Sequence, residues 1–142
     1  MVADWFDLPG PPILEERAEP WLVHSSQVSN LHKYLVSVGA SVVEVRIGNA
    51  RSVVDVVGAL KEVLEFPRWC GSGWDSIDDA FEELRAAWPL PLGIVVRGLP
   101  ELLAGWPHLA LETVLGLSRL SKGFGVEGDQ VLVFYVSDRP ET

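Results

Sequence analysis

Three short, strongly apolar segments, separated by helix-like stretches, constrain the fold of this chain more than any other feature. They are "SVVEVRIG" from Ser41, "LGIVVRG" from Leu92 and "QVLVFYVS" from Gln130. The last two are apolar almost throughout, which is typical of strands buried on both faces of a sheet. Strands joined by helical crossovers favour a parallel sheet. We therefore expect an α/β fold in which helices pack on three parallel strands.

The first 40 residues differ in character from the rest. "LPGPPILEERAEP" is rich in proline and charge and predicts an irregular arm. "WLVHSS" is compatible with a short edge strand, and "VSNLHKYLVSVGA" with a helix that ends near Gly39. We accordingly divide the chain into an N-terminal extension, residues 1–40, and a main domain, residues 41–142.

The net charge of the chain limits the kinds of macromolecule that it can bind. The chain has 142 residues and a formal net charge of −9, so a phosphate backbone would repel it and direct nucleic-acid binding is not expected. A basic protein is the partner that this charge favours. The chain has no apolar run of about 18 residues and no basic segment leading into an apolar one, so we expect neither a membrane span nor a secretory signal. With Cys70 as its single cysteine, the protein is expected in the cytoplasm.

The segment "FPRWCGSGWDSIDDAFEEL", Phe66 to Leu84, carries the most pronounced charge pattern. We expect Pro67 to end the preceding helix and a single acidic helix to run from about Asp75 to Ala87. Acidic side chains one turn apart would form a stripe on it, and apolar side chains at helical spacing would anchor it to the core. The acids are Asp75, Asp78, Asp79, Glu82 and Glu83, and the apolar residues are Trp74, Ile77, Phe81 and Leu84.

Two interpretations of this acidic face stand side by side. Like charges three and four residues apart repel by roughly 0.2–0.5 kcal/mol per pair, so either water screens a solvated face or a basic partner binds there. The flanking "WCGSGWD" favours the partner, since tryptophan beside charge is typical of interfaces. Gly71 and Gly73 fit turn geometry before a helix, and equally a loop that lets a partner approach closely.

No catalytic or metal-binding constellation emerges, and we expect no cofactor. His24, His32 and His108 lack metal-ligand spacing, and Cys70 fits a structural role. An enzyme that uses Asp75 and Asp79 as an acid–base pair remains the rival from another class. Two acids on one helix face point outward together, however, whereas glycosidase pairs flank a cleft from different elements.

The quoted segment resembles the signature of barstar-like proteins, the intracellular inhibitors of small secreted ribonucleases. The matching features are a proline that ends a helix, an aromatic, a glycine, and then an aspartate opening a helix with another aspartate one turn later. The resemblance runs from Ser41 to Ser137 and implies a three-stranded parallel sheet with helices packed on it, here with an N-terminal extension of about 40 residues. It also implies a 1:1 complex with a basic secreted ribonuclease.

The resemblance implies a role for individual residues. Asp79 would occupy the phosphate site of the ribonuclease, and Asp75 would pair with a basic residue beside it. Aromatic contacts would come from Trp69 and Trp74, and close approach from Gly71. Together with the remaining loop and helix residues, the expected partner-binding set is Trp69, Gly71, Gly73, Trp74, Asp75, Asp78, Asp79, Glu82 and Glu83.

The chain departs from the family pattern at three positions. Gly73 stands where the family usually has asparagine, Asp78 where it often has an aromatic, and Leu120 where the prototype uses a glutamate. These departures leave open whether the target is a guanyl-specific ribonuclease or a different, non-ribonuclease toxin against which the chain would act as an immunity protein.

Overall fold

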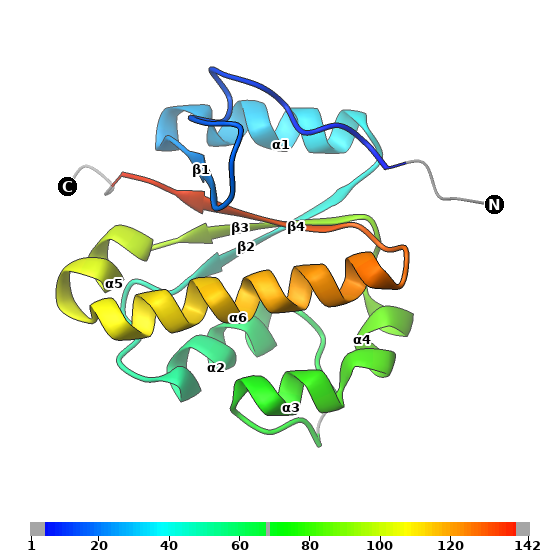
Figure 1. Cartoon of the computed structure of the whole chain (residues 1–142), viewed down its shortest axis with the longest axis vertical. Coiled ribbons are helices and arrows are strands. Elements are labelled where there is room, and N and C mark those ends of the chain that lie inside the picture. Colours follow the sequence, from blue (N-terminus) through cyan, green and yellow to red (C-terminus); the bar gives the residue numbers. More distant parts are fainter. Residues whose placement is uncertain (1–4, 68, 139–142) are drawn as a thin grey trace.

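The computed structural model describes residues 5–67 and 69–138, which form an α/β fold with helices on both faces of a parallel sheet (Figure 1). In chain order the elements are β1 (Trp21–Val23), the 3-10 turn η1 (Ser25–Gln27), α1 (Val28–Ser37), β2 (Ser41–Arg46), α2 (Val53–Val63), α3 (Trp74–Asp79), α4 (Phe81–Ala87), β3 (Leu92–Arg97), α5 (Leu99–Gly105), α6 (Pro107–Val126) and β4 (Val131–Val136).

The sheet has four strands in the order β1-β4-β3-β2, all parallel. The three strands expected from the apolar segments are β2, β3 and β4, and the two apolar throughout, β3 and β4, lie in the centre of the sheet, where both faces are covered. The expectation of only three strands is wrong, because Trp21–Val23 pairs with Phe134–Val136 of β4. The short edge strand considered at "WLVHSS" does form, as β1, and it satisfies the backbone edge of β4.

Two apolar cores flank the sheet. On one face, α1 and the N-terminal arm cover a cluster that includes Leu14, Leu35 and Phe134, all almost fully buried. On the other face lie α2 to α6. The arm is also tied down by polar contacts, since Phe6 and the Gln130 side chain exchange two hydrogen bonds, of 3.2 and 3.1 Å. Residues 5–40 thus complete the sheet and one core, while the division at residue 41 stays a prediction.

The acidic segment does not form the single helix expected over residues 75–87. Two short helices, α3 and α4, meet at Ala80, which is fully buried. The Ala80 N–H is shared between the carbonyls of Ser76 and Ile77, at 3.2 and 3.1 Å, the tighter geometry common where a helix ends. Packing of α4 against the end of α6 explains the break better than any local signal.

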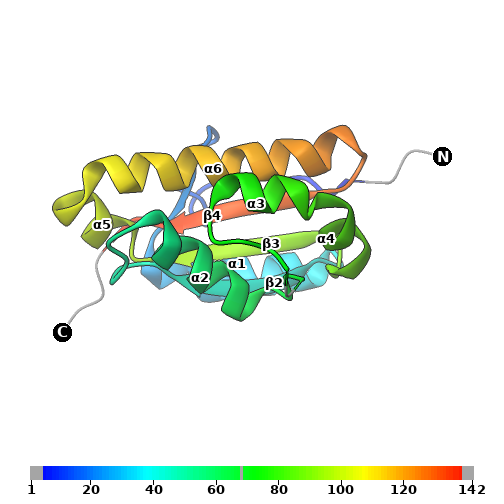
Figure 2. The same ribbon diagram turned by 90° about the horizontal axis from the view of Figure 1, so that it is seen from below.

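The long helix α6 lies alongside α3 and α4, and Figure 2 shows α2, α3 and α4 spread over the same face of the sheet. Gly123 does not end this helix, which continues to Val126. Gly123 lies against Phe81 instead, and a Cβ placed on it would be 3.3 Å from that ring. Even with its 20 residues, α6 is not long and apolar enough to cross a membrane, and neither is any other helix within the two described ranges.

Candidate functional site

We call the exposed carboxylates of α3 and α4 the acidic surface; they are Asp75, Asp78, Asp79, Glu82 and Glu83. The break at Ala80 places them on two helices rather than in one stripe. Asp75 lies in the first turn of α3, and Glu82 and Glu83 lie in the first turn of α4, where the helix dipole favours negative charge. This arrangement offsets part of the repulsion that a single continuous helix would suffer.

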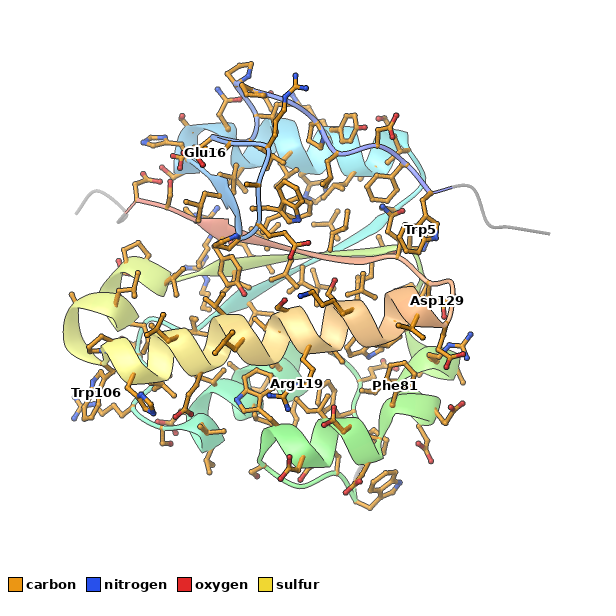
Figure 3. The ribbon with its side chains drawn as sticks, in the orientation of Figure 1. Trp5, Glu16, Phe81, Trp106, Arg119 and Asp129 are labelled. Atoms are coloured by element: carbon orange, nitrogen blue, oxygen red, sulfur yellow. The ribbon has the colours of Figure 1, made fainter. Side chains whose placement is uncertain are left out.

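Apolar side chains on the core-facing side of α3 and α4 anchor the acidic surface, as expected from the sequence. Ile77 and Leu84 are buried, and Trp74 and Phe81 are partly buried against the main core. The Phe81 ring meets Phe124 of α6 at a centroid distance of 4.9 Å, and Figure 3 shows Phe81 between α4 and α6. The carboxylates are therefore presented by helices whose backbone is fixed from beneath.

Trp74 relies on a residue that sequence reasoning missed. Its ring lies against Gly116 of α6, where an added Cβ would stand 2.6–2.7 Å from three ring atoms. The available signal was a glycine in the middle of an amphipathic helix, which costs about 1 kcal/mol relative to alanine and so indicates close packing. Trp74 was expected to contact both the core and a partner, and its core contact is confirmed.

The one basic residue of α3 and α4, Arg85, pairs with acids outside the acidic surface. The Arg85 guanidinium donates to Asp129 Oδ2 at 2.7 Å and lies 3.5 Å from a Glu127 carboxylate oxygen, both beyond the end of α6. Its hydrogen bond to Asp129 is the main reason that the pKa of Arg85 is raised. Across residues 5–67 and 69–138, no salt bridge involves a carboxylate of the acidic surface.

The loop before α3 combines an exposed ring with a buried thiol. Trp69, five residues before α3, is 58% exposed. Cys70 is buried, its carbonyl accepts a hydrogen bond from Lys61 Nζ at 2.6 Å, and its Sγ donates to the Ser76 carbonyl at 3.4 Å. Burial raises the pKa of the Cys70 thiol, in keeping with a structural cysteine. Gly71 faces Ser76 so closely that an added Cβ would collide with its hydroxyl, so a packing contact within the loop disfavours a side chain at this position.

The departures from the family pattern have structural counterparts. Gly73 is the N-cap of α3 and provides no side-chain hydrogen bond, with open space where a Cβ would stand. The capping side chain that the resemblance implied is thus missing. Leu120 is buried in the core at 5% exposure, so it offers no contact to a partner. Its neighbour Arg119 is exposed and lies on the side of α6 that faces α3 (Figure 3).

No metal site is formed by the described part of the chain, where no cluster of three or more histidine, cysteine, aspartate or glutamate side chains is arranged to hold a metal ion. His108 pairs with Glu112 one helical turn away, at 2.6 Å. Two cavities, of about 620 and 220 Å³, are lined by neither Asp75 nor Asp79, so neither cavity encloses the pair on which the enzymatic alternative depends.

Comparisons with known proteins point in one direction. A search of curated proteins finds no match. The sequence model of one family, described as Barstar (barnase inhibitor), matches residues 40–136. The matched region includes β2 to β4, all the helices that cover one face of the sheet, and the whole acidic surface. The chain belongs to the Barstar family of barnase inhibitors.

Proposed function

We propose that this protein inhibits a small secreted guanyl-specific ribonuclease by plugging its active site with the acidic surface. The observation that carries the proposal is a set of exposed carboxylates on two helices that Trp74 and Phe81 anchor to the core, none of which forms a salt bridge with another described residue. A ribonuclease binds the phosphates of RNA with basic side chains, and a preordered set of carboxylates imitates those phosphates.

The mechanism uses charge in two stages. The net charge of −9 attracts a basic enzyme over a long range and raises the association rate. At contact, Asp79 enters the phosphate site, Asp75 pairs with a neighbouring base, and desolvation of these pairs slows dissociation. Trp69, exposed in the loop before α3, covers the rim of the active site. Substrate is excluded, and no covalent chemistry takes place on the inhibitor.

In this role the protein protects the producing bacterial cell, in its cytoplasm, from its own ribonuclease before export. The second candidate is an immunity protein for a different basic toxin. Asp78 favours this candidate, because it makes the exposed face more acidic than the aromatic usual in the family. The small-molecule enzyme is disfavoured, because Asp75 and Asp79 are exposed and line neither cavity.

An inhibition titration tests the proposal. A guanyl-specific secreted ribonuclease is mixed with increasing amounts of the protein, and cleavage of RNA is followed. Asp79→Ala removes the central carboxylate, and Glu16→Ala is the matched control. Glu16 is an exposed acid of the N-terminal arm, on the opposite side of the sheet from α3 and α4 (Figure 3).

We expect stoichiometric inhibition by the unchanged protein and by Glu16→Ala, and its loss in Asp79→Ala. Equal inhibition by all three proteins would overturn the assignment of the acidic surface as the contact. No inhibition at micromolar protein would reject this ribonuclease class as target and leave the toxin-immunity alternative, to be tested by binding to basic nuclease toxins of other specificity.

A further inference from the structure

The larger cavity lies where bound small molecules are common in this kind of fold. It has a volume of about 620 Å³, within the roughly 300–1,000 Å³ typical of small-molecule sites. Its walls include the last residues of three strands, Arg46, Arg97 and Val136, and the turn that follows β2. In open parallel sheets, ligands bind in the crevice at the carboxyl ends of the strands.

Two arginines end neighbouring strands at this edge. Arg46 and Arg97 are the last residues of β2 and β3 and are paired in register. Residues an even number of positions apart in a strand lie on the same face of the sheet. Arg46 therefore shares a face with Val42, and Arg97 with Val95, and both valines pack in the core under α1. Like charges directly opposite on neighbouring strands destabilise a sheet, so folding does not require this pair.

Only one of the two arginines takes part in an ion pair among the described residues. Arg97 forms an ion pair with Glu44, whereas no carboxylate of residues 5–67 and 69–138 forms one with Arg46. Asp138, which also lines the cavity, is engaged by Ser25, since it accepts hydrogen bonds from the Ser25 backbone N–H at 2.7 Å and hydroxyl at 2.5 Å. A protein with a net charge of −9 thus keeps a paired-arginine site in a cavity wall.

We propose that this cavity binds a small molecule through an oxyanion group, a phosphate or a carboxylate, held between Arg46 and Arg97. Guanidinium groups suit both oxyanions, because their planar forks donate two parallel hydrogen bonds. The wall on the α2 and α5 side carries Asp55, Glu62 and Glu101, so the rest of the ligand presents hydrogen-bond donors there. These carboxylates and the acidic surface would repel a polyanion such as RNA, which restricts the ligand to a small molecule.

The site is independent of the proposed ribonuclease inhibition, because the cavity includes no residue of the acidic surface. Its test uses inorganic phosphate and malonate as separate probes, so that the two oxyanions are distinguished. Binding is followed by shifts of backbone amide resonances and by thermal unfolding, with sodium chloride at equal ionic strength as reference. The variant is Arg46→Gln, which leaves the Arg97–Glu44 pair in place, and the control is Arg119→Gln, an exposed arginine on α6 outside the cavity.

We expect one or both probes to shift the amides of Gly48, Asn49 and Gly98 saturably and to raise the Tm. In Arg46→Gln the affinity should fall by at least about tenfold, while the Tm without probe stays unchanged or rises. Arg119→Gln should bind like the unchanged protein. The proposal is overturned if neither probe binds saturably in the millimolar range, or if all three proteins respond alike, as ionic screening would cause.

Discussion

Replacement of Gly116 by alanine should displace Trp74 and with it the start of α3. A Cβ at position 116 would stand 2.6 Å from the Cδ2 and Cε2 atoms of the indole, whereas carbon atoms in contact normally lie about 3.5–4.0 Å apart. The ring must therefore move by about 1 Å. Because Trp74 is the first residue of α3, the helix that carries Asp75 and Asp79 moves with it.

The size of the effect follows from two opposing terms. Overpacking of this kind destabilises a folded protein by about 1–3 kcal/mol, and alanine in place of glycine inside a helix stabilises it by about 1 kcal/mol. The net loss at Gly116 should be up to about 2 kcal/mol. Gly58, inside α2, has nothing within 4 Å of its added Cβ, so Gly58→Ala should show the favourable term alone.

Equilibrium unfolding of both variants in urea measures the difference directly. We expect Gly58→Ala to be more stable than the unchanged protein by up to about 1 kcal/mol, and Gly116→Ala to lie about 1–3 kcal/mol below Gly58→Ala. For a chain of this size, each kcal/mol corresponds to roughly 4 °C in Tm. Equal stabilisation by the two alanines would refute the packing of Trp74 against α6.

Three further predictions concern single residues. Gly73→Asn should stabilise the protein by a few tenths of a kcal/mol, since asparagine caps a helix better than glycine. Urea unfolding measures this change, and a loss of stability would contradict the assignment of residue 73 as a helix cap. Partial burial raises the pKa of Asp138, but hydrogen bonds from Ser25 outweigh it and hold the pKa below its ordinary value. Asp138 therefore stabilises the fold at pH values above its ordinary pKa, and this contribution should vanish as pH falls through the lowered value. In Asp138→Asn, the free energy of unfolding should depend less on pH between about pH 5 and 2. An unchanged pH dependence of the free energy of unfolding would contradict this role of Asp138. Cys70, buried with a raised pKa, should react with a thiol reagent far more slowly in native protein than in urea, and equal rates would contradict its burial.

The parts of the fold that could be predicted from sequence are those with a local signal. β3 and β4 are continuous apolar runs because both of their faces are covered, and such runs are visible in the sequence. For β1, which has three residues, the sequence allowed a short edge strand but did not indicate that it joins the sheet beside β4. Its membership in the sheet depends on a partner more than 100 residues away in the chain.

In the candidate site, too, some features could be predicted from local sequence and others depend on tertiary contacts. The exposure of its five acids and the anchoring role of Ile77 and Leu84 follow from helical spacing. The break at Ala80 does not, because it depends on packing of α4 against Gly123 and Phe124 of α6. Local propensity favours one continuous helix, and tertiary contacts override it.

The central claim is that the acidic surface is kept for binding rather than for folding, and Asp79→Ala tests it most directly. Its affinity for a guanyl-specific ribonuclease and its free energy of unfolding should be measured on the same preparation. Stability should stay unchanged or rise by about 0.2–0.5 kcal/mol, since repulsion from Asp75 one turn away is removed. Affinity should fall by at least about a hundredfold, the loss expected when a buried charge loses its partner. A large loss of stability with unchanged affinity would contradict the claim and identify Asp79 as a structural group.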